Sequence, residues 1–230
     1  MEVKIGKSYL TKISHEGREL TFQYPAFKGT YANVAEQIDK AKLKRPNSSE
    51  TASLVYDAWK TPNEKYSQEI IKILRDNWFW EYTGNLYLPK SNEEINNGVI
   101  LDLDSQNLKF ENGKLIMDKP SLIERLKNND SLVKFVPFGY KIEFQNLFEF
   151  QKNLYIVERY GKEGAEKIAE IASKYKCNPC LWSFNSVNRE EARMSALDDY
   201  WLFGDGLNVN GGSWNDVDNG RAFRVCKEEE

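Results

Sequence analysis

Three cysteines and one histidine are the residues of this chain best suited to nucleophilic, redox or metal chemistry. Cys177 and Cys180 form a C-x-x-C pair, which in redox proteins stands at a helix N-terminus because the helix dipole lowers the thiol pKa. Here the pair follows a predicted helix that ends near Lys176, so we expect structural thiols. A zinc site needs four ligands, and only Cys226 and His15 remain to complete one.

The other catalytic constellations are equally incomplete. A serine or cysteine nucleophile needs a base, and His15 lies beside Glu16 and Gly17 in a predicted surface turn with no nucleophile elbow near it. The adjacent carboxylates at 190–191 and 198–199 could act as acid and base, but neighbouring charges are usually solvated. The glycines near residue 210 fit no phosphate-binding pattern. We therefore predict no catalytic residues, no metal ligands and no enzyme.

Composition and charge limit the partners. The chain has 230 residues, 40% of them hydrophobic and 29% charged, which is typical of a globular domain. Its net charge of −3 offers no basic field for nucleic acid. Charged residues interrupt the N-terminal stretch every few positions, and no apolar run reaches the length of a membrane span. We expect a soluble cytoplasmic protein without membrane insertion; a place on a virion or cell surface stays open.

The elements that would position any site follow an α+β pattern. Short runs at 8–13 and 19–24 predict two strands around a turn, and helical spacing of apolar residues predicts helices at 31–43, 49–59 and 63–78. Ser48 or Ser49 is the expected N-cap of the second helix. Extended runs then follow, with helices at 121–126 and 162–176, and CLWSF at 180–184 reads as a buried strand. No linker divides these segments, so we predict one domain over residues 1–230.

The stretch from Asp198 to Gly220 fits no regular period. It mixes five Asp, four Asn and five Gly with several aromatic residues, which predicts one long ordered loop. Rigid aromatic residues among small polar ones are typical of a recognition surface. Carbonyl and carboxylate oxygens are also ligands for hard cations, so calcium remains an open alternative, although the spacing is not that of an EF-hand.

Two motifs in this stretch resemble a known fold. GGSWND at 211–216 and GRAFRV at 220–225 resemble the end of the C-type-lectin-like fold found in formylglycine-generating enzymes. Sugar-binding C-type lectins also carry paired cysteines and a Glu-Pro-Asn calcium motif, and this chain has neither. Segments such as TASLVYDAWK, TGNLYLPK, VKFVPFGYK and EGAEKIAEIA, from about Thr51 onward, resemble archaeal variable proteins of diversity-generating retroelements.

That resemblance implies a non-enzymatic ligand-binding protein. In the family, errors copied from template adenines diversify the 3′ end of the gene, and the varied residues face solvent and bind ligand. Residues 181–225 would be the variable region here, with Leu207, Trp214, Phe223 and Val225 as scaffold. The implied ligand-binding positions are Asp199, Tyr200, Leu202, Phe203, Asp205, Asn208, Asn210, Ser213, Asn215, Asp216 and Asp218.

The implied partner is a protein or other surface macromolecule, and the oligomeric state is left open. Two alternatives remain. One is an oxidoreductase of the formylglycine-generating type, which would rely on cysteines that hold copper. The other is a structural or virion surface protein without a dedicated ligand.

Overall fold

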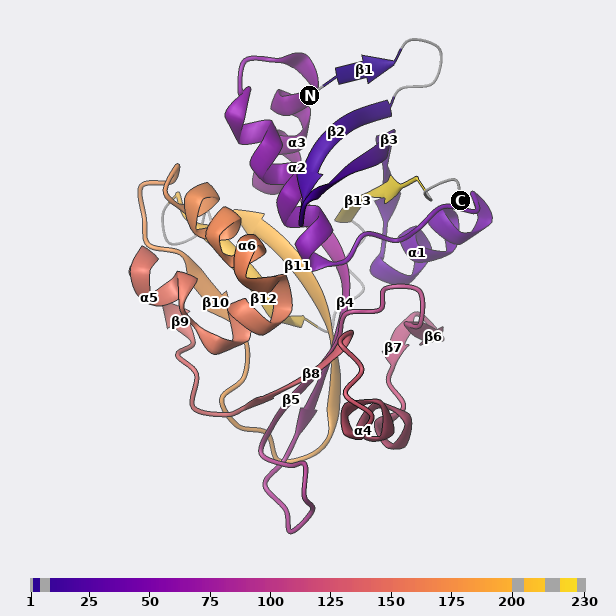
Figure 1. The fold of residues 1–230 in the computed structure, drawn as a ribbon, viewed down its shortest axis with the longest axis vertical. Helices are drawn as coiled ribbons and strands as arrows, with labels where there is room; N and C mark the ends of the chain where they lie inside the picture. Colours follow the sequence, from indigo (N-terminus) through magenta and orange to yellow (C-terminus); the bar gives the residue numbers. More distant parts are fainter. Residues whose placement is uncertain (1, 5–8, 200–204, 214–219, 227–230) are drawn as a thin grey trace.

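One large sheet with helices packed against it organises the chain. The computed structural model describes residues 2–4, 9–199, 205–213 and 220–226 (Figure 1). Its strands are β1 (Glu2–Lys4), β2 (Tyr9–His15), β3 (Arg18–Gly29), β4 (Trp78–Leu88), β5 (Gly98–Asp102), β6 (Lys109–Glu111), β7 (Lys114–Ile116), β8 (Val133–Pro137), β9 (Glu143–Phe144), β10 (Cys180–Trp182), β11 (Glu191–Asp199), β12 (Leu207–Ser213) and β13 (Gly220–Val225). Its helices are α1 (Tyr31–Lys40), α2 (Ser48–Lys60), α3 (Lys65–Asp76), α4 (Lys119–Lys127), α5 (Leu147–Gln151) and α6 (Leu154–Ala172). The predicted α+β class is confirmed.

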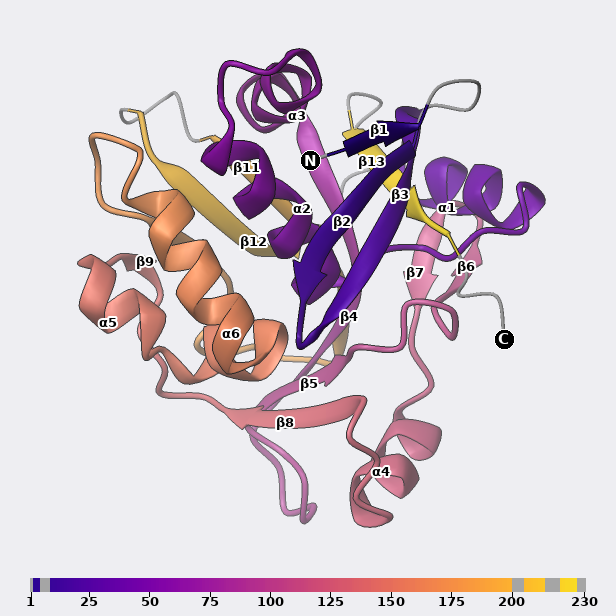
Figure 2. The same cartoon turned by 45° about the horizontal axis from the view of Figure 1, so that its top comes forward.

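The sheet joins strands from both ends of the sequence. Eleven of the described strands belong to it, in the order β1-β2-β3-β13-β4-β11-β12-β10-β9, with β5 beside β4 and β8 beside β5. β13 lies between β3 and β4, antiparallel to the first and parallel to the second. Figure 2 shows this strand beside β3. β6 and β7 form a separate hairpin.

Local sequence explains where the helices begin. The side chain of Thr30 caps α1 by accepting a hydrogen bond from the Asn33 amide. α2 starts after Asn47, whose side chain accepts from the Glu50 amide at 2.9 Å while the Glu50 carboxylate accepts from the Asn47 amide at 3.0 Å. This capping box places the N-cap one residue before the predicted serines, because Asn satisfies the free helix amides as well as Ser does.

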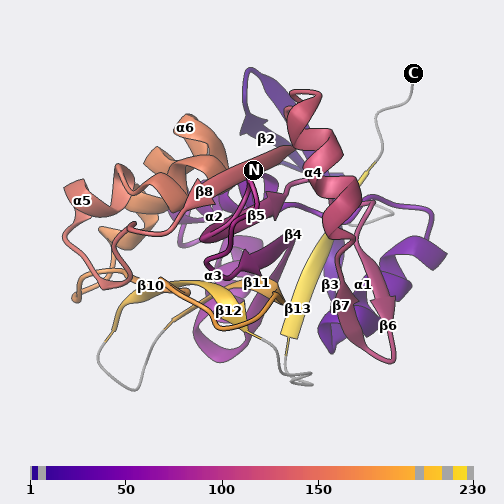
Figure 3. The same ribbon diagram turned by 90° about the horizontal axis from the view of Figure 1, so that it is seen from below.

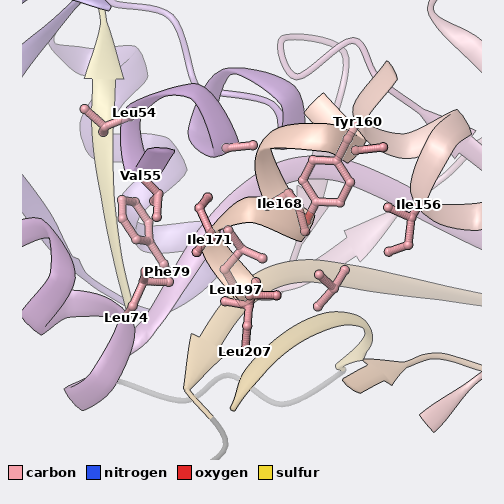
Figure 4. Packing of buried hydrophobic residues seen from close by; sticks show 14 of the residues in the cluster. Leu54, Val55, Leu74, Phe79, Ile156, Tyr160, Ile168, Ile171, Leu197 and Leu207 are labelled. Carbon is pink, nitrogen blue, oxygen red and sulfur yellow. The ribbon is translucent and has the colours of Figure 1, made fainter. Parts of the chain in front are cut away.

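The main core lies between the sheet and helices α2, α3 and α6. Leu197 of β11 and Leu207 of β12 are fully buried, together with Ile168 and Ile171 of α6 (Figure 4). Each such side chain contributes about 1.5–3 kcal/mol by leaving water. α6 therefore holds β11 and β12 through one side of those strands. None of the described helices is long and apolar enough to cross a membrane.

A second core fills the other side of the sheet near its middle. Tyr31 of α1 contacts the Trp80 ring edge-on at 5.4 Å, and both side chains are fully buried. Met194 and Ala196 of β11 belong to this cluster, whereas Leu197 belongs to the main core. β11 therefore separates two cores with alternate residues, as a strand inside a sheet does.

The structure corrects the expected position of His15. Its side chain is only 3% exposed, so it is not a surface-turn residue. The Nδ1 atom lies 3.0 Å from Ser53 Oγ, and the Lys167 ammonium donates to the same oxygen at 2.9 Å. The predicted turn exists at Glu16 and Gly17, but His15 itself ends β2 on the side that faces α2 and α6. Burial lowers the pKa of His15.

The irregular loop predicted from Asp198 to Gly220 is also wrong. β11 extends to Asp199, and residues 207–213 form β12 inside the sheet. β9 and α5 were likewise absent from the prediction. CLWSF is a strand only over Cys180–Trp182, where Trp182 is 52% exposed rather than buried. The sequence pattern did not predict β12 because most of its residues are Asn and Gly, which are uncommon in strands.

Candidate binding face on strands β10, β11 and β12

Three of the predicted binding residues share one side of β12. Asn208 pairs with Asp198 of β11, and Asn210 pairs with Ala196, whereas Leu207 and Val209, which alternate with them, enter the main core. Directly paired residues project to the same side of a sheet. Asn208 and Asn210 therefore lie on the side away from α6. Figure 3 shows α5 and α6 on one side of β10 and β12.

A β-bulge brings Ser213 to the same side. Ser213 pairs with Met194, so three steps along β12 match two steps along β11, and Gly211 and Gly212 supply the extra residue. Gly211 could carry no side chain, because a Cβ there would overlap the Tyr155 hydroxyl. Its carbonyl oxygen instead accepts a hydrogen bond from the Tyr87 hydroxyl at 2.9 Å. The GGS motif thus has a packing reason that the sequence alone did not reveal.

The resemblance implied that these three side chains face solvent, but all three are buried. Asn208 and Asn210 are each 2% exposed, and Ser213 is 9% exposed. The expectation assumed a loop over these positions, whereas they belong to β12, an inner strand between β10 and β11. The predicted scaffold residues Leu207, Phe223 and Val225 are buried.

The remaining predicted positions divide into two groups. Asp199 pairs with Leu207 and so projects to the opposite side from Asn208, while Asp205 is exposed in the segment before β12 and lies 3.9 Å from the Lys176 ammonium. Neither joins the three residues above. The predicted positions Tyr200, Leu202, Phe203, Asn215, Asp216 and Asp218, and the scaffold residue Trp214, lie outside the described residues.

Three residues that the prediction did not assign border the same face. Asp198 lies beside Asn208, whose amide nitrogen is 3.1 and 3.2 Å from the two carboxylate oxygens. Trp182 of β10 pairs with Asn210, and Phe144 of β9 pairs with Cys180. The Trp182 and Phe144 side chains are 52% and 46% exposed. We call Phe144, Trp182, Asp198, Asn208, Asn210 and Ser213 the β12 face.

The electrostatics of the β12 face are set mainly by the Asp198 carboxylate. Burial raises the pKa of Asp198 to about 7, and the neighbouring charge of Asp199 acts in the same direction. The amide of Asn208 opposes this only in part. No described Lys, Arg or His forms an ion pair with Asp198, and the Oδ1 atom of Asn208 accepts no hydrogen bond from the described part of the chain.

A buried polar network supports the face from the core side. Arg159 of α6 donates to the Asn210 carbonyl oxygen at 3.0 Å and to the Tyr155 hydroxyl at 3.2 Å. It also pairs with the Glu81 carboxylate, and both side chains are fully buried. The Tyr155 hydroxyl donates to Asn85 Oδ1 at 2.6 Å. This network fixes the backbone of β12 to α6 and β4 through directed bonds.

The residues considered for catalysis do not come together in the described ranges. Cys177, Cys180 and Cys226 are free thiols, and burial raises the pKa of Cys180 to about 11, which suppresses its thiolate. Asp198 and Asp199 project to opposite sides of β11. Within residues 2–4, 9–199, 205–213 and 220–226, no three His, Cys, Asp or Glu side chains are grouped as metal ligands.

Comparison with known proteins adds no assignment. No family model matches the chain, and no curated protein or solved structure matches it.

Proposed function

We propose that this chain is a non-enzymatic ligand-binding protein with a C-type-lectin-like fold, and that the β12 face with its adjoining segments is its recognition surface. In this proposal a retroelement diversifies residues 181–225, and the partner is a protein or other surface macromolecule. The observation that carries the proposal is that alternate residues of β12 project to opposite sides of the sheet. Asn208 and Asn210 project to the side of the sheet opposite the main core, while Leu207 and Val209, which alternate with them, enter the main core and hold the strand in place.

That division would let binding residues change without loss of the fold. Leu207 and Val209 are buried, and Arg159 and Tyr87 bond to the backbone of β12, whichever side chains occupy 208 and 210. The Asn210 side chain contributes one further bond, because its Oδ1 atom accepts from the Gly212 amide at 3.1 Å. Backbone bonds survive side-chain replacement. The exposed rings of Trp182 and Phe144 supply the rigid contact area that recognition surfaces use.

A substitution series on one strand tests the proposal. Asn208→Ser and Asn210→Ser should fold, with melting temperatures within about 5 °C of the parent, since a loss near 1 kcal/mol is the typical effect of one substitution. Leu207→Ser is the matched control on the other side of the same strand and should lose several kcal/mol. If the Asn variants unfold as readily as Leu207→Ser, a tolerant display surface is excluded.

The genetic part of the proposal has its own test. A near-repeat of the DNA that encodes residues 181–225, differing at adenines and lying beside a reverse transcriptase gene, is the expected finding. A genomic neighbourhood without that repeat would contradict retroelement diversification, whatever the substitution series shows.

A further inference from the structure

The turn between β2 and β3 is held against α2 and α6 by polar contacts (Figure 2). The Lys167 ammonium of α6 donates to the Ser14 carbonyl oxygen at 2.8 Å and to Ser53 Oγ of α2 at 2.9 Å. The Glu16 amide donates to a Glu163 carboxylate oxygen at 3.4 Å. Because these contacts are polar, they respond to a change of charge at the turn.

The Ser53 hydroxyl is shared between two basic groups. Ser53 is 1% exposed, and its Oγ atom lies 3.0 Å from His15 Nδ1 and 2.9 Å from Lys167 Nζ. An ammonium group can only donate, so the Ser53 oxygen accepts from Lys167. Within the described residues the hydroxyl makes no third hydrogen bond, so its hydrogen is donated to His15 Nδ1. This arrangement requires a neutral His15 ring with its proton on Nε2.

A proton on Nδ1 would disrupt this arrangement. His15 and Lys167 would then both donate to the one Ser53 oxygen, and the hydroxyl hydrogen would be left without an acceptor in a buried site. Two positive charges would also meet at that oxygen. Burial disfavours the charged ring as well, and it is the largest cause of the lowered pKa of His15.

The charged groups around His15 come from the turn, β3, α2 and α6. They are Arg18, Lys167, Glu16, Glu50 and Glu163. The two cations disfavour a protonated ring, and the carboxylates favour it. The Glu16 carboxylate lies 3.8 Å from Nε2, but its side chain is 53% exposed, so water weakens the attraction. Glu50 and Glu163 each already pair with a lysine. Burial and the cations therefore prevail.

We propose that the β2–β3 turn is an acid-operated latch, in which a proton on His15 releases residues 14–18 from α2 and α6. The strands on either side of the turn stay in place, because Ile13 and Leu20 are buried in the main core. The released ring reaches water, where its charge is solvated. This opening does not depend on the binding role proposed for the β12 face.

The first test is NMR of the full chain, in which His15 is the only histidine and its ring signals are therefore unambiguous. At neutral pH the ring nitrogen signals should show a proton on Nε2 and none on Nδ1. The second test is amide hydrogen exchange at about pH 7.5 and about pH 5, on either side of the ordinary histidine pKa, with correction for the intrinsic effect of pH.

Protection of residues 14–18 should fall by about threefold to tenfold in acid. A difference of one pKa unit between the closed and open turn changes the opening equilibrium by about tenfold. Protection of residues 20–23, which lie further along the same hairpin, should stay unchanged.

Two variants identify the groups that operate the latch. His15→Asn retains a side-chain acceptor for the Ser53 hydroxyl but cannot titrate, so exchange of residues 14–18 should lose its dependence on acid. Lys167→Met removes the competing donor, so the pKa of His15 should rise. Lys174→Met is the matched control, because it removes an exposed ammonium group just beyond α6 and should leave the pKa of His15 unchanged.

Four results would overturn the latch. A proton on Nδ1 at neutral pH would mean that the Ser53 hydroxyl does not donate to His15. An unchanged acid response in His15→Asn would place the responsible proton elsewhere, and an unchanged His15 pKa in folded Lys167→Met would exclude competition at Ser53. Equal loss of protection in residues 14–18 and 20–23 would mean that acid opens the sheet rather than the turn. The ring signals are measured on the parent protein, so they decide the matter even if Lys167→Met fails to fold.

Discussion

Arg159 and Glu81 form an ion pair in which neither side chain is exposed to solvent. Ser48 Oγ lies 2.9 Å from Arg159 Nε, and the Tyr160 hydroxyl donates to Glu81 at 2.9 and 3.0 Å, so both charged groups are held by further hydrogen bonds. A buried pair of this kind is costly to break, because removal of one partner leaves an uncompensated charge in the core.

Arg159→Met should therefore lower the free energy of unfolding by about 3–5 kcal/mol, measured by urea denaturation. The double variant Arg159→Met with Glu81→Leu removes both charges and should lose less than the single one. A double variant that is less stable than Arg159→Met would show that the hydrogen-bond network, rather than the buried charge, is decisive.

Gly211→Ala should destabilise the protein by about 1–3 kcal/mol, because its methyl group would overlap the Tyr155 hydroxyl. Gly212→Ala is the control in the same bulge, where the nearest atom is 3.3 Å away on the exposed Trp182 ring and can move. Thermal unfolding of both variants makes the comparison. Equal losses would assign the effect to bulge geometry instead of the Tyr155 contact.

Acid should destabilise the protein through His15. Burial lowers its pKa in the folded state, so the unfolded chain binds the proton more readily. The free energy of unfolding is therefore unaffected by His15 above its unfolded pKa of about 6.5. It declines as the pH falls below that value, because protonation then favours the unfolded chain. His15→Asn should flatten this part of the stability curve. An unchanged curve in the variant would place the acid sensitivity elsewhere.

Asp198 should have the opposite effect on the pH profile. Its pKa of about 7 in the folded state exceeds the value of about 3.9 for an unfolded aspartate, so folding favours the protonated form. The contribution of Asp198 to the free energy of unfolding is therefore most favourable below about pH 4, and it declines as the pH rises to about 7. Asp198→Asn should therefore be more stable than the parent at pH 8, by about 1–3 kcal/mol. A less stable variant would mean that the ionised carboxylate is satisfied in the folded protein.

Trp182 and Trp80 should differ in their contribution to stability. Trp182→Ala should leave the melting temperature within about 2 °C of the parent, because the ring is 52% exposed. Trp80→Ala removes a fully buried ring and should cost about 3–5 kcal/mol. Calorimetry of the two proteins tests this, and a large loss in Trp182→Ala would make that ring structural.

The sequence predicted the elements that carry a clear hydrophobic period. The first three helices and the strands of the N-terminal hairpin lie within a few residues of their expected positions because apolar spacing and caps mark them. α6 begins eight residues before its expected start, at Leu154 instead of 162, and Gly161 with φ 70° interrupts the helix between the two positions. Composition alone gives no signal for such an interruption.

The candidate site was harder to predict because its signals are long-range. Asn208 and Asn210 alternate with Leu207 and Val209, which is a strand pattern. Asn and Gly are uncommon in strands, so the composition of this segment argues against one. The need for glycine at position 211 comes from the Tyr155 hydroxyl of α6, which is distant in the sequence. Exposure of Trp182 follows from its alternation with the buried Leu181 on β10, a period-two pattern that is present in the sequence.

The position of β13 sets the order in which the chain can fold during synthesis. Residues 18–29 and 78–88 cannot close the sheet between them until residues 220–225 leave the ribosome. Until then the edges of β3 and β4 stay unpaired, and such edges favour association with other chains. Every sequence placed between Asp199 and Gly220 must also keep the connection that delivers β13 to this gap. A change that breaks this connection would leave the edges of β3 and β4 unpaired after synthesis as well.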